Sequence, residues 1–213
     1  EIERVAARGA VRGLEIANSL DMLPLYHPDW DPLWAAANAA KLPVHVHTIG
    51  QPKVDTTGFA PLQQRQAFAL QIAGFQMGMS RILMEVVFGG VLETYPDLRL
   101  VIAESGIGWI PYILEHMDLE WEEQFKDLTL KMKPSEYWHR QCKATYQSDT
   151  VGLRLLDILG EDNVMWGSDF PHPDGVWPDS QAFLEREVGH LPEATRRKVI
   201  CENAAELYGF PLQ

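Results

Sequence analysis

Five short apolar segments recur along the chain, and each is followed by a segment with helical periodicity. The five segments cover residues 11–17, 43–47, 98–103, 142–146 and 164–166. No two neighbouring segments are joined by the two-residue glycine or asparagine turn that is typical of a β-hairpin. Strands that alternate with helices in this way predict a parallel sheet built from β–α units.

A parallel sheet of this kind has two common forms, and the sequence favours one. An open, doubly wound sheet normally carries a full glycine-rich phosphate loop, which Gly106-Ile107-Gly108 lacks. The other form is the (β/α)8 TIM barrel, which typically occupies about 250 residues. We therefore expect residues 1–213 to be a single domain, the C-terminal portion of an α/β TIM barrel. About five of the eight strands are expected in this chain, with three upstream of Glu1.

Composition argues against several partners and compartments. The net charge is −12, and no basic block offsets it, which argues against nucleic acid and anionic membranes. Cys142 and Cys201 are the only cysteines and are far apart, so we predict free thiols in a reducing compartment, the cytoplasm. No stretch approaches the roughly eighteen apolar residues of a spanning helix, and a signal-peptide pattern is not found at the N-terminus.

Polar residues with catalytic chemistry stand at the ends of the predicted strands rather than on the helices. His45 and His47 lie two residues apart in the second strand, a spacing that points both side chains to one face. Glu104 follows the third strand, and Asp169 follows the fifth. Because all strand ends of a parallel barrel face one rim, we expect these side chains to share a pocket.

His47 and Asp169 are the candidates for a metal site. Neutral imidazole is the commonest metal ligand, and a carboxylate at a strand end can bind a cation or accept a proton. His47 is nearer the strand end than His45, so it is the stronger ligand candidate. His45 is predicted to contact substrate, with a hydrogen-bonded core histidine as the alternative. Asp169 has the alternative of capping its own turn.

Three further residues complete the predicted pocket. Glu104 ends an apolar run, where a carboxylate is costly without a partner. We predict that it is a general acid or base with a pKa raised by burial, with a metal ligand or an arginine ion pair as alternatives. His172 lies between two prolines and is predicted to bind or orient substrate. Trp109 is predicted to wall the pocket, although aromatic residues near helix starts more often belong to the core.

Four motifs, taken in order, point to one known family. They are residues 42–47 (LPVHVH), 89–106, 167–172 (GSDFPH) and 202–204 (ENA). With these motifs the chain resembles the amidohydrolase-related branch of the amidohydrolase superfamily, which includes aminocarboxymuconate semialdehyde decarboxylase and resorcylate-type decarboxylases. The resemblance covers nearly the whole chain.

The resemblance implies a distorted TIM barrel with one divalent metal, usually zinc and sometimes manganese. By this likeness His47 is the metal ligand from the fifth barrel strand, and Asp169 is the carboxylate from the eighth, a metal ligand or proton acceptor. The family's first-strand His-x-His or Glu-x-His pair has no counterpart here, and its expected place is upstream of residue 1. Decarboxylase members carry histidine where this chain has Glu104, which would repel a carboxylate substrate unless its pKa is raised.

Two classes of function follow from these residues. The first is a metal-dependent enzyme that hydrolyses or non-oxidatively decarboxylates a small cyclic or aromatic substrate, with Asp169 or Glu104 moving a proton. The second is a catalytically inactive barrel that acts as a binding or assembly subunit, which the incomplete ligand set would fit. The metal content of the protein separates the two. The sequence leaves a homodimer open and names neither the substrate nor the metal.

Overall fold

The five predicted strands are all present in the structure, a computed structural model that describes residues 1–16, 19, 21–47, 54–172 and 175–212. The first three strands are shorter than predicted, and the fourth and fifth match their predicted bounds. The strands are β1 (Leu14–Ile16), β2 (Val44–His47), β3 (Leu100–Ala103), β4 (Cys142–Tyr146) and β5 (Val164–Trp166).

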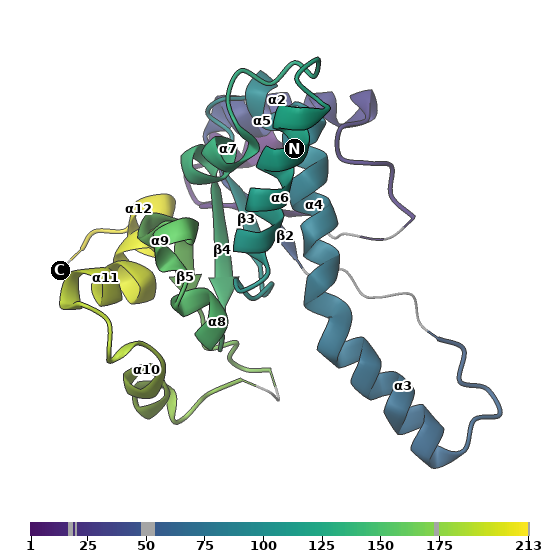
Figure 1. The fold of residues 1–213 in the computed structure, drawn as a ribbon. Helices are drawn as coiled ribbons and strands as arrows, with labels where there is room; N and C mark the ends of the chain where they lie inside the picture. Colours follow the sequence, from purple (N-terminus) through teal and green to yellow (C-terminus); the bar gives the residue numbers. More distant parts are fainter. Residues whose placement is uncertain (17–18, 20, 48–53, 173–174, 213) are drawn as a thin grey trace.

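The strands form one parallel sheet in the order β1-β2-β3-β4-β5, so each strand pairs with the next one in the sequence (Figure 1). A doubly wound sheet reverses its strand order partway, whereas a barrel does not. The observed order therefore confirms the predicted α/β barrel architecture. Among the described residues the sheet stays open between β1 and β5.

The two faces of the sheet differ in chemistry. Alternate residues of a strand point to opposite faces, and in β2 the side chains of Val44 and Val46 are fully buried in the hydrophobic core. His45 and His47 therefore lie on the opposite face, level with Val101 and Ala103 of β3. The predicted pairing of the two histidines on one face is confirmed.

Helices connect the strands and cover the apolar face of the sheet. Residues 151–159 have the periodicity of a single helix, but they form two short helices instead. The α-helices are α1 (Ile2–Ala6), α2 (Asp31–Ala40), α3 (Pro61–Gly74), α4 (Met79–Phe88), α5 (Val91–Thr94), α6 (Ile110–Glu123), α7 (Pro134–Gln141), α8 (Thr150–Leu153), α9 (Leu156–Leu159), α10 (Ser180–Val188), α11 (Glu193–Arg197) and α12 (Asn203–Tyr208). Shorter 3-10 helices are η1 (Pro28–Trp30), η2 (Phe75–Gly78) and η3 (Glu161–Asn163), and η4 (Lys198–Glu202) is a π-helix.

Large aromatic side chains fasten helices α2 and α7 to neighbouring segments of the chain. Trp34 and Trp138 are fully buried. Their indole N–H groups donate to the backbone oxygens of Leu25 and Leu159 at 2.9 and 2.7 Å. A buried indole with its N–H satisfied contributes apolar contact without an unpaired donor.

Within the described ranges, no helix combines the length and the apolar character that a bilayer crossing requires.

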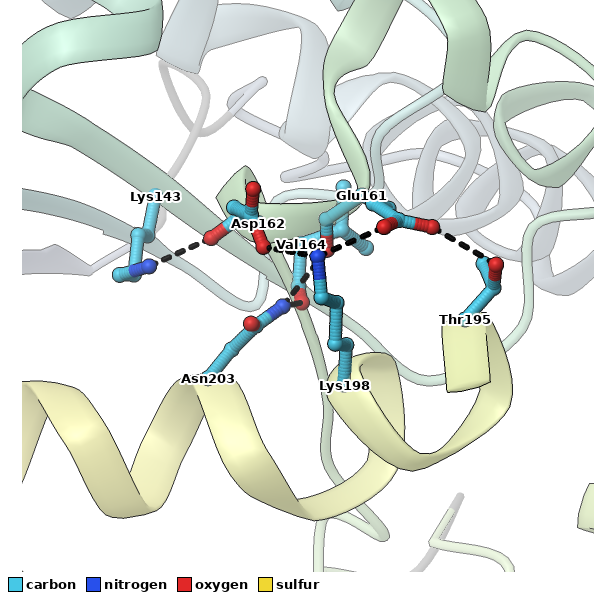
Figure 2. A network of polar contacts seen from close by, with 7 residues as sticks. All are labelled: Lys143, Glu161, Asp162, Val164, Thr195, Lys198 and Asn203. Atoms are coloured by element: carbon cyan, nitrogen blue, oxygen red, sulfur yellow. Dashed lines mark hydrogen bonds and ion pairs between the residues drawn. The ribbon is translucent and has the colours of Figure 1, made fainter. Parts of the chain in front are cut away.

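The C-terminal helices are fastened to the start of β5 by a polar network (Figure 2). The Asn203 side chain is almost fully buried, and its amide donates to the backbone oxygens of Glu161 and Val164 at 2.7 and 2.8 Å. Lys198 binds the Glu161 and Asp162 carboxylates at 2.6 and 2.8 Å. The sequence motif at 202–204 therefore has a structural role, because Asn203 fixes the strand that leads to Asp169.

We predict that Asn203→Ala lowers the free energy of unfolding by about 2 to 4 kcal/mol, because one buried and one partly buried carbonyl group lose their donor. Lys198→Ala is the matched control in the same network, and we expect it to lower that free energy by at most about 1 kcal/mol, since its ion pairs are partly exposed. Urea denaturation followed by circular dichroism measures both. Equal losses in the two variants would contradict the role given to Asn203.

The two cysteines are free, as predicted, but their surroundings differ. Cys142 on β4 is buried, and burial raises the pKa of its thiol to about 12. Cys201 is exposed. We predict that a thiol-specific chromogenic reagent labels one cysteine in the native protein and two after unfolding, because thiolate is the reactive form. Cys201→Ser should abolish the native labelling, and native labelling of Cys142 would contradict the packing of β4.

Candidate functional site

The carboxyl ends of β2 and β3 bring a histidine and a glutamate together. His47 ends β2 and is paired in register with Ala103, the residue before Glu104. As a result, His47 Nε2 lies 2.8 Å from Glu104 Oε2. The glutamate side chain is 27% exposed, so it is less buried than the sequence predicts. An arginine ion pair was the alternative for Glu104, but Arg81 binds Glu85 instead.

The loop after β5 brings a second acid and histidine to the same place. His172 Nδ1 lies 3.1 Å from Asp169 Oδ2. The backbone N–H of His172 also donates to the backbone oxygen of Asp169 at 2.8 Å. One ligand atom from each of Glu104, Asp169 and His172 lies within 4.8 Å of the other two. Together with His47, these residues form a continuous cluster, which we call the rim cluster. The structure thus brings together side chains from three strand ends, as expected, and their predicted sharing of a pocket stays a prediction.

Both acids of the rim cluster have a left-handed backbone. Glu104 has a φ of 51° and Asp169 a φ of 57°. Among the described residues other than glycine, the third with a positive φ is Lys41, at the C-terminal end of α2. This conformation is uncommon for residues with a Cβ atom and is enriched at functional sites. The surrounding structure therefore has to hold the two acids in place.

Thr145 of β4 holds the Glu104 backbone, and Asp149, in the loop after β4, holds the loop that follows Glu104. The sequence indicates neither contact. The Glu104 N–H donates to Thr145 Oγ1 at 2.8 Å. Asp149 accepts hydrogen bonds from the N–H groups of Ile107 and Gly108 at 2.7 and 2.6 Å, and from Gly152 at 2.8 Å. The sequence predicts Asp149 as a helix cap, which the Gly152 bond confirms. Its additional grip on the loop after β3 depends on tertiary structure.

His45 has different surroundings from His47. Its Nδ1 is 2.8 Å from the Leu14 oxygen and its Nε2 is 2.7 Å from the Tyr208 hydroxyl, against which the ring also stacks. Both ring nitrogens are therefore engaged with protein groups. These contacts match the alternative of a hydrogen-bonded histidine, and the predicted contact of His45 with substrate stays a prediction that the geometry does not favour.

Trp109 lies just before α6, close in sequence to Glu104. Its indole N–H donates to the Ser105 oxygen at 2.8 Å, and the ring packs partly against the hydrophobic core. The residue is half-buried. It therefore braces the loop that follows Glu104, and its predicted role as a pocket wall stays a prediction.

The rim cluster has the composition of a divalent-cation site. Two carboxylates within 4.8 Å of each other repel unless a proton or a cation lies between them. Carboxylate oxygen and imidazole nitrogen are ligands that zinc and manganese accept. Ligand atoms bound to one ion at about 2.1 Å lie up to roughly 4.2 Å apart, so small side-chain movements would bring these donors onto one ion. The residues therefore fit the predicted metal.

The fold and the rim cluster define a class of protein, a parallel α/β barrel with a polar, cation-compatible site at the carboxyl ends of its strands. A family model described as "Amidohydrolase" matches residues 1–210. The chain belongs to this amidohydrolase family, as the resemblance predicted.

Several known proteins are similar to the chain. The 2-amino-3-carboxymuconate-6-semialdehyde decarboxylase of Dictyostelium discoideum is 21% identical over 217 residues, covering 99% of this chain and 56% of that protein. The crystal structure of 5-carboxyvanillate decarboxylase from Sphingomonas paucimobilis is 26% identical, with a TM-score of 0.79, over 98% of this chain and 61% of that one. The crystal structure of a dihydroxybenzoic acid decarboxylase from Polaromonas sp. JS666 contains manganese and 2-nitroresorcinol. It is 18% identical, with a TM-score of 0.74, over 98% of this chain and 64% of that one. The chain thus spans less than two thirds of the length of these proteins.

We predict that Asp149→Ala loosens the loop after β3, because three backbone N–H groups lose their acceptor. The free energy of unfolding should fall by about 2 to 4 kcal/mol, and hydrogen exchange should accelerate at Ile107 and Gly108. Asp157→Ala, at an exposed acid on α9, is the matched control and should leave both unchanged. Unchanged exchange at Ile107 and Gly108 in Asp149→Ala would contradict the clamp.

Proposed function

We propose that the protein is a metal-dependent carboxy-lyase that removes the carboxyl group of a small aromatic or cyclic substrate without oxidation. The observation that carries this proposal is the rim cluster, in which Glu104, Asp169 and His172 lie within 4.8 Å and His47 pairs with Glu104. Support comes from the three similar proteins described above, all of which are decarboxylases by name.

Decarboxylation requires positive charge near the substrate carboxylate and a proton for the ring carbon, and the rim cluster can supply both. A divalent cation held by His47 and Asp169, with Glu104 or His172 beside them, would supply positive charge for the substrate carboxylate and a neighbouring oxygen. In the reaction, the bond between the ring and the carboxyl carbon breaks, carbon dioxide leaves, and the ring carbon gains one proton. The chain's own residues have to deliver that proton to the ring carbon.

Glu104 is the residue we propose as the proton carrier. Its Oε2 lies 2.8 Å from His47 Nε2, so the carboxyl group stands beside the proposed metal ligand, where it can give a proton to the substrate. Asp169 is the second proposed proton-transfer group, since its Oδ2 is hydrogen-bonding distance from His172 Nδ1. His172 is 60% exposed and is proposed to orient the substrate, with Trp109 closing one wall.

Hydrolysis is the second candidate function, and Glu104 is the observation that favours it. By resemblance, decarboxylases have histidine at this position, where a carboxylate repels an anionic substrate. A carboxylate beside a cation is instead suited to take a proton from attacking water. The same rim cluster then acts on a neutral amide or ester.

The choice of metal also forms part of the proposal. Zinc is proposed first because imidazole and carboxylate donors suit it. Manganese is the alternative, and two solved structures with the same fold contain it. A full-length protein purified after expression with both metals should hold about one equivalent of one of them, whereas less than about a tenth of an equivalent would favour the inactive barrel.

The test of function compares the metal-loaded protein on an aromatic carboxylate, such as 5-carboxyvanillate or a dihydroxybenzoate, and on neutral amides and esters. We predict release of carbon dioxide, and a fall in kcat/KM of at least about a hundredfold in Asp169→Asn and Glu104→Gln. Glu115→Gln, at an exposed acid on α6, is the control and should match the unsubstituted protein. If the protein turns over only the amides and esters, hydrolysis is its function and decarboxylation is wrong. Full activity of Asp169→Asn would contradict both proposed functions.

A further inference from the structure

Helices α8 and α10, which lie in the lower half of Figure 1, line a cavity of about 350 Å³. A volume of this order suits a small organic ligand. From α8 and its C-terminal end come Thr150, Leu153 and Arg154, and from α10 and the residues after it come Arg186, Glu187 and His190. None of these residues belongs to the rim cluster, so the cavity is a separate place in the molecule.

Glu187 is the buried acid of this cavity. The residue is 6% exposed, and its Oε2 is sealed from solvent without a hydrogen-bond partner among the described residues. The exposed acid on the same helix, Glu185, pairs with Arg196 at 3.6 Å, whereas none of the described ion pairs includes Glu187. Burying a carboxylate is costly unless a cation or hydrogen-bond donors reach it. Glu187 therefore lacks the positive partner that its burial requires.

Tyr146, the last residue of β4, is a second buried polar group close to Glu187. It is 2% exposed, and its hydroxyl also has no hydrogen-bond partner among the described residues. Burial raises the pKa of Tyr146, and the charges of Glu187 and Asp149 raise it further, so the hydroxyl is neutral and within electrostatic range of Glu187. Buried polar groups normally have partners. Two exceptions so near each other point to a bound molecule that completes their hydrogen bonds.

Two arginines bring positive charge to the cavity. Arg154 follows α8 and Arg186 lies on α10, and both are exposed. Neither residue takes part in an ion pair with a described acid. The Arg186 guanidinium lies 4.6 Å from the centre of the Phe183 ring, a contact that leaves the N–H groups at its edge able to bind an anion. The planar fork of arginine matches a carboxylate, so the cavity is suited to one.

An unpaired acid and unpaired arginines that line one cavity complement a ligand with both charges. A water molecule would complete hydrogen bonds but would leave the Glu187 charge unbalanced. An anion alone would be repelled by Glu187, and a cation alone by the arginines. A free α-amino acid carries an ammonium and a carboxylate group on one carbon atom. An amino acid inside a peptide has neither charge there, so the complementarity is to the free form.

We infer that the cavity between α8 and α10 binds a free α-amino acid. Glu187 binds the ammonium group, and the final torsion of a glutamate side chain is broad enough for the carboxylate to turn toward it. Arg154 and Arg186 donate to the ligand carboxylate, and Leu153 contacts its side chain. The inference goes beyond the proposed function and does not rest on it, because the rim cluster takes no part in this binding.

The experiment is isothermal titration calorimetry on the full-length protein with L-alanine, L-serine and L-leucine, each to about 10 mM, a range that covers millimolar dissociation constants. We expect at least one of them to bind. Glu187→Gln should weaken that binding by at least about tenfold, because a charge-assisted hydrogen bond is lost. Glu185→Gln, on the same helix with a 75% exposed side chain, is the matched control and should bind as the unsubstituted protein does. Circular dichroism checks that each variant is folded.

Two simpler ions test whether both charges of the ligand are read. Acetate carries the carboxylate alone and ethylammonium the cation alone, and we expect each to bind at least about tenfold more weakly than the amino acid. Three outcomes would overturn the inference. They are an absence of binding by all three amino acids, equal affinity in Glu187→Gln and the unsubstituted protein, and acetate that binds as tightly as the amino acid. The last would show that the arginines recognise a carboxylate without any contribution from Glu187.

Discussion

The closeness of two carboxylates is the constraint on which the site depends. Glu104 and Asp169 come from strands that are not neighbours, yet their oxygens lie within 4.8 Å. Like charges at this distance, on a left-handed backbone, are held only because other parts of the fold compensate. Thr145 holds the Glu104 backbone from β4, and Asn203 holds the start of β5 from the C-terminal helices. The β–α units and these polar contacts thus together fix the positions of the two carboxylates.

The sequence predicts the strands and the main site residues because both leave local signals. Short apolar segments that are each followed by helical periodicity predict the five strands, and residues at strand ends of a parallel barrel meet at one rim. His47 and Asp169 were found in this way. Thr145 and Asp149 left no such signal, because a threonine in a strand and an aspartate before a helix are common. Their importance comes from the loop after β3, about 40 residues earlier in the chain.

Other predictions were limited by contacts between distant segments. Strand period places His45 beside His47 but does not reveal Tyr208, which lies 163 residues away and binds the His45 ring. The segment at 151–159 has helical periodicity, yet the backbone breaks between α8 and α9. Residues 51–59 are polar and predict a loop beyond the end of β2, but part of this segment and part of the loop after Asp169 lie outside the described residues. The exposure of α3, which contains no buried residue, was also not predicted, because periodicity indicates a helix without showing whether other segments cover it.

The left-handed backbone at Glu104 has a consequence for how this family diversifies. Few side chains tolerate that conformation, and histidine, asparagine and aspartate are enriched among those that do. Histidine is the residue that the resemblance assigns to decarboxylases at this position. An exchange between glutamate and histidine would therefore leave the main chain where it is, while a β-branched residue would force it to move. Substitution of this one residue could therefore exchange the group that we propose as the proton carrier, with the scaffold unaltered.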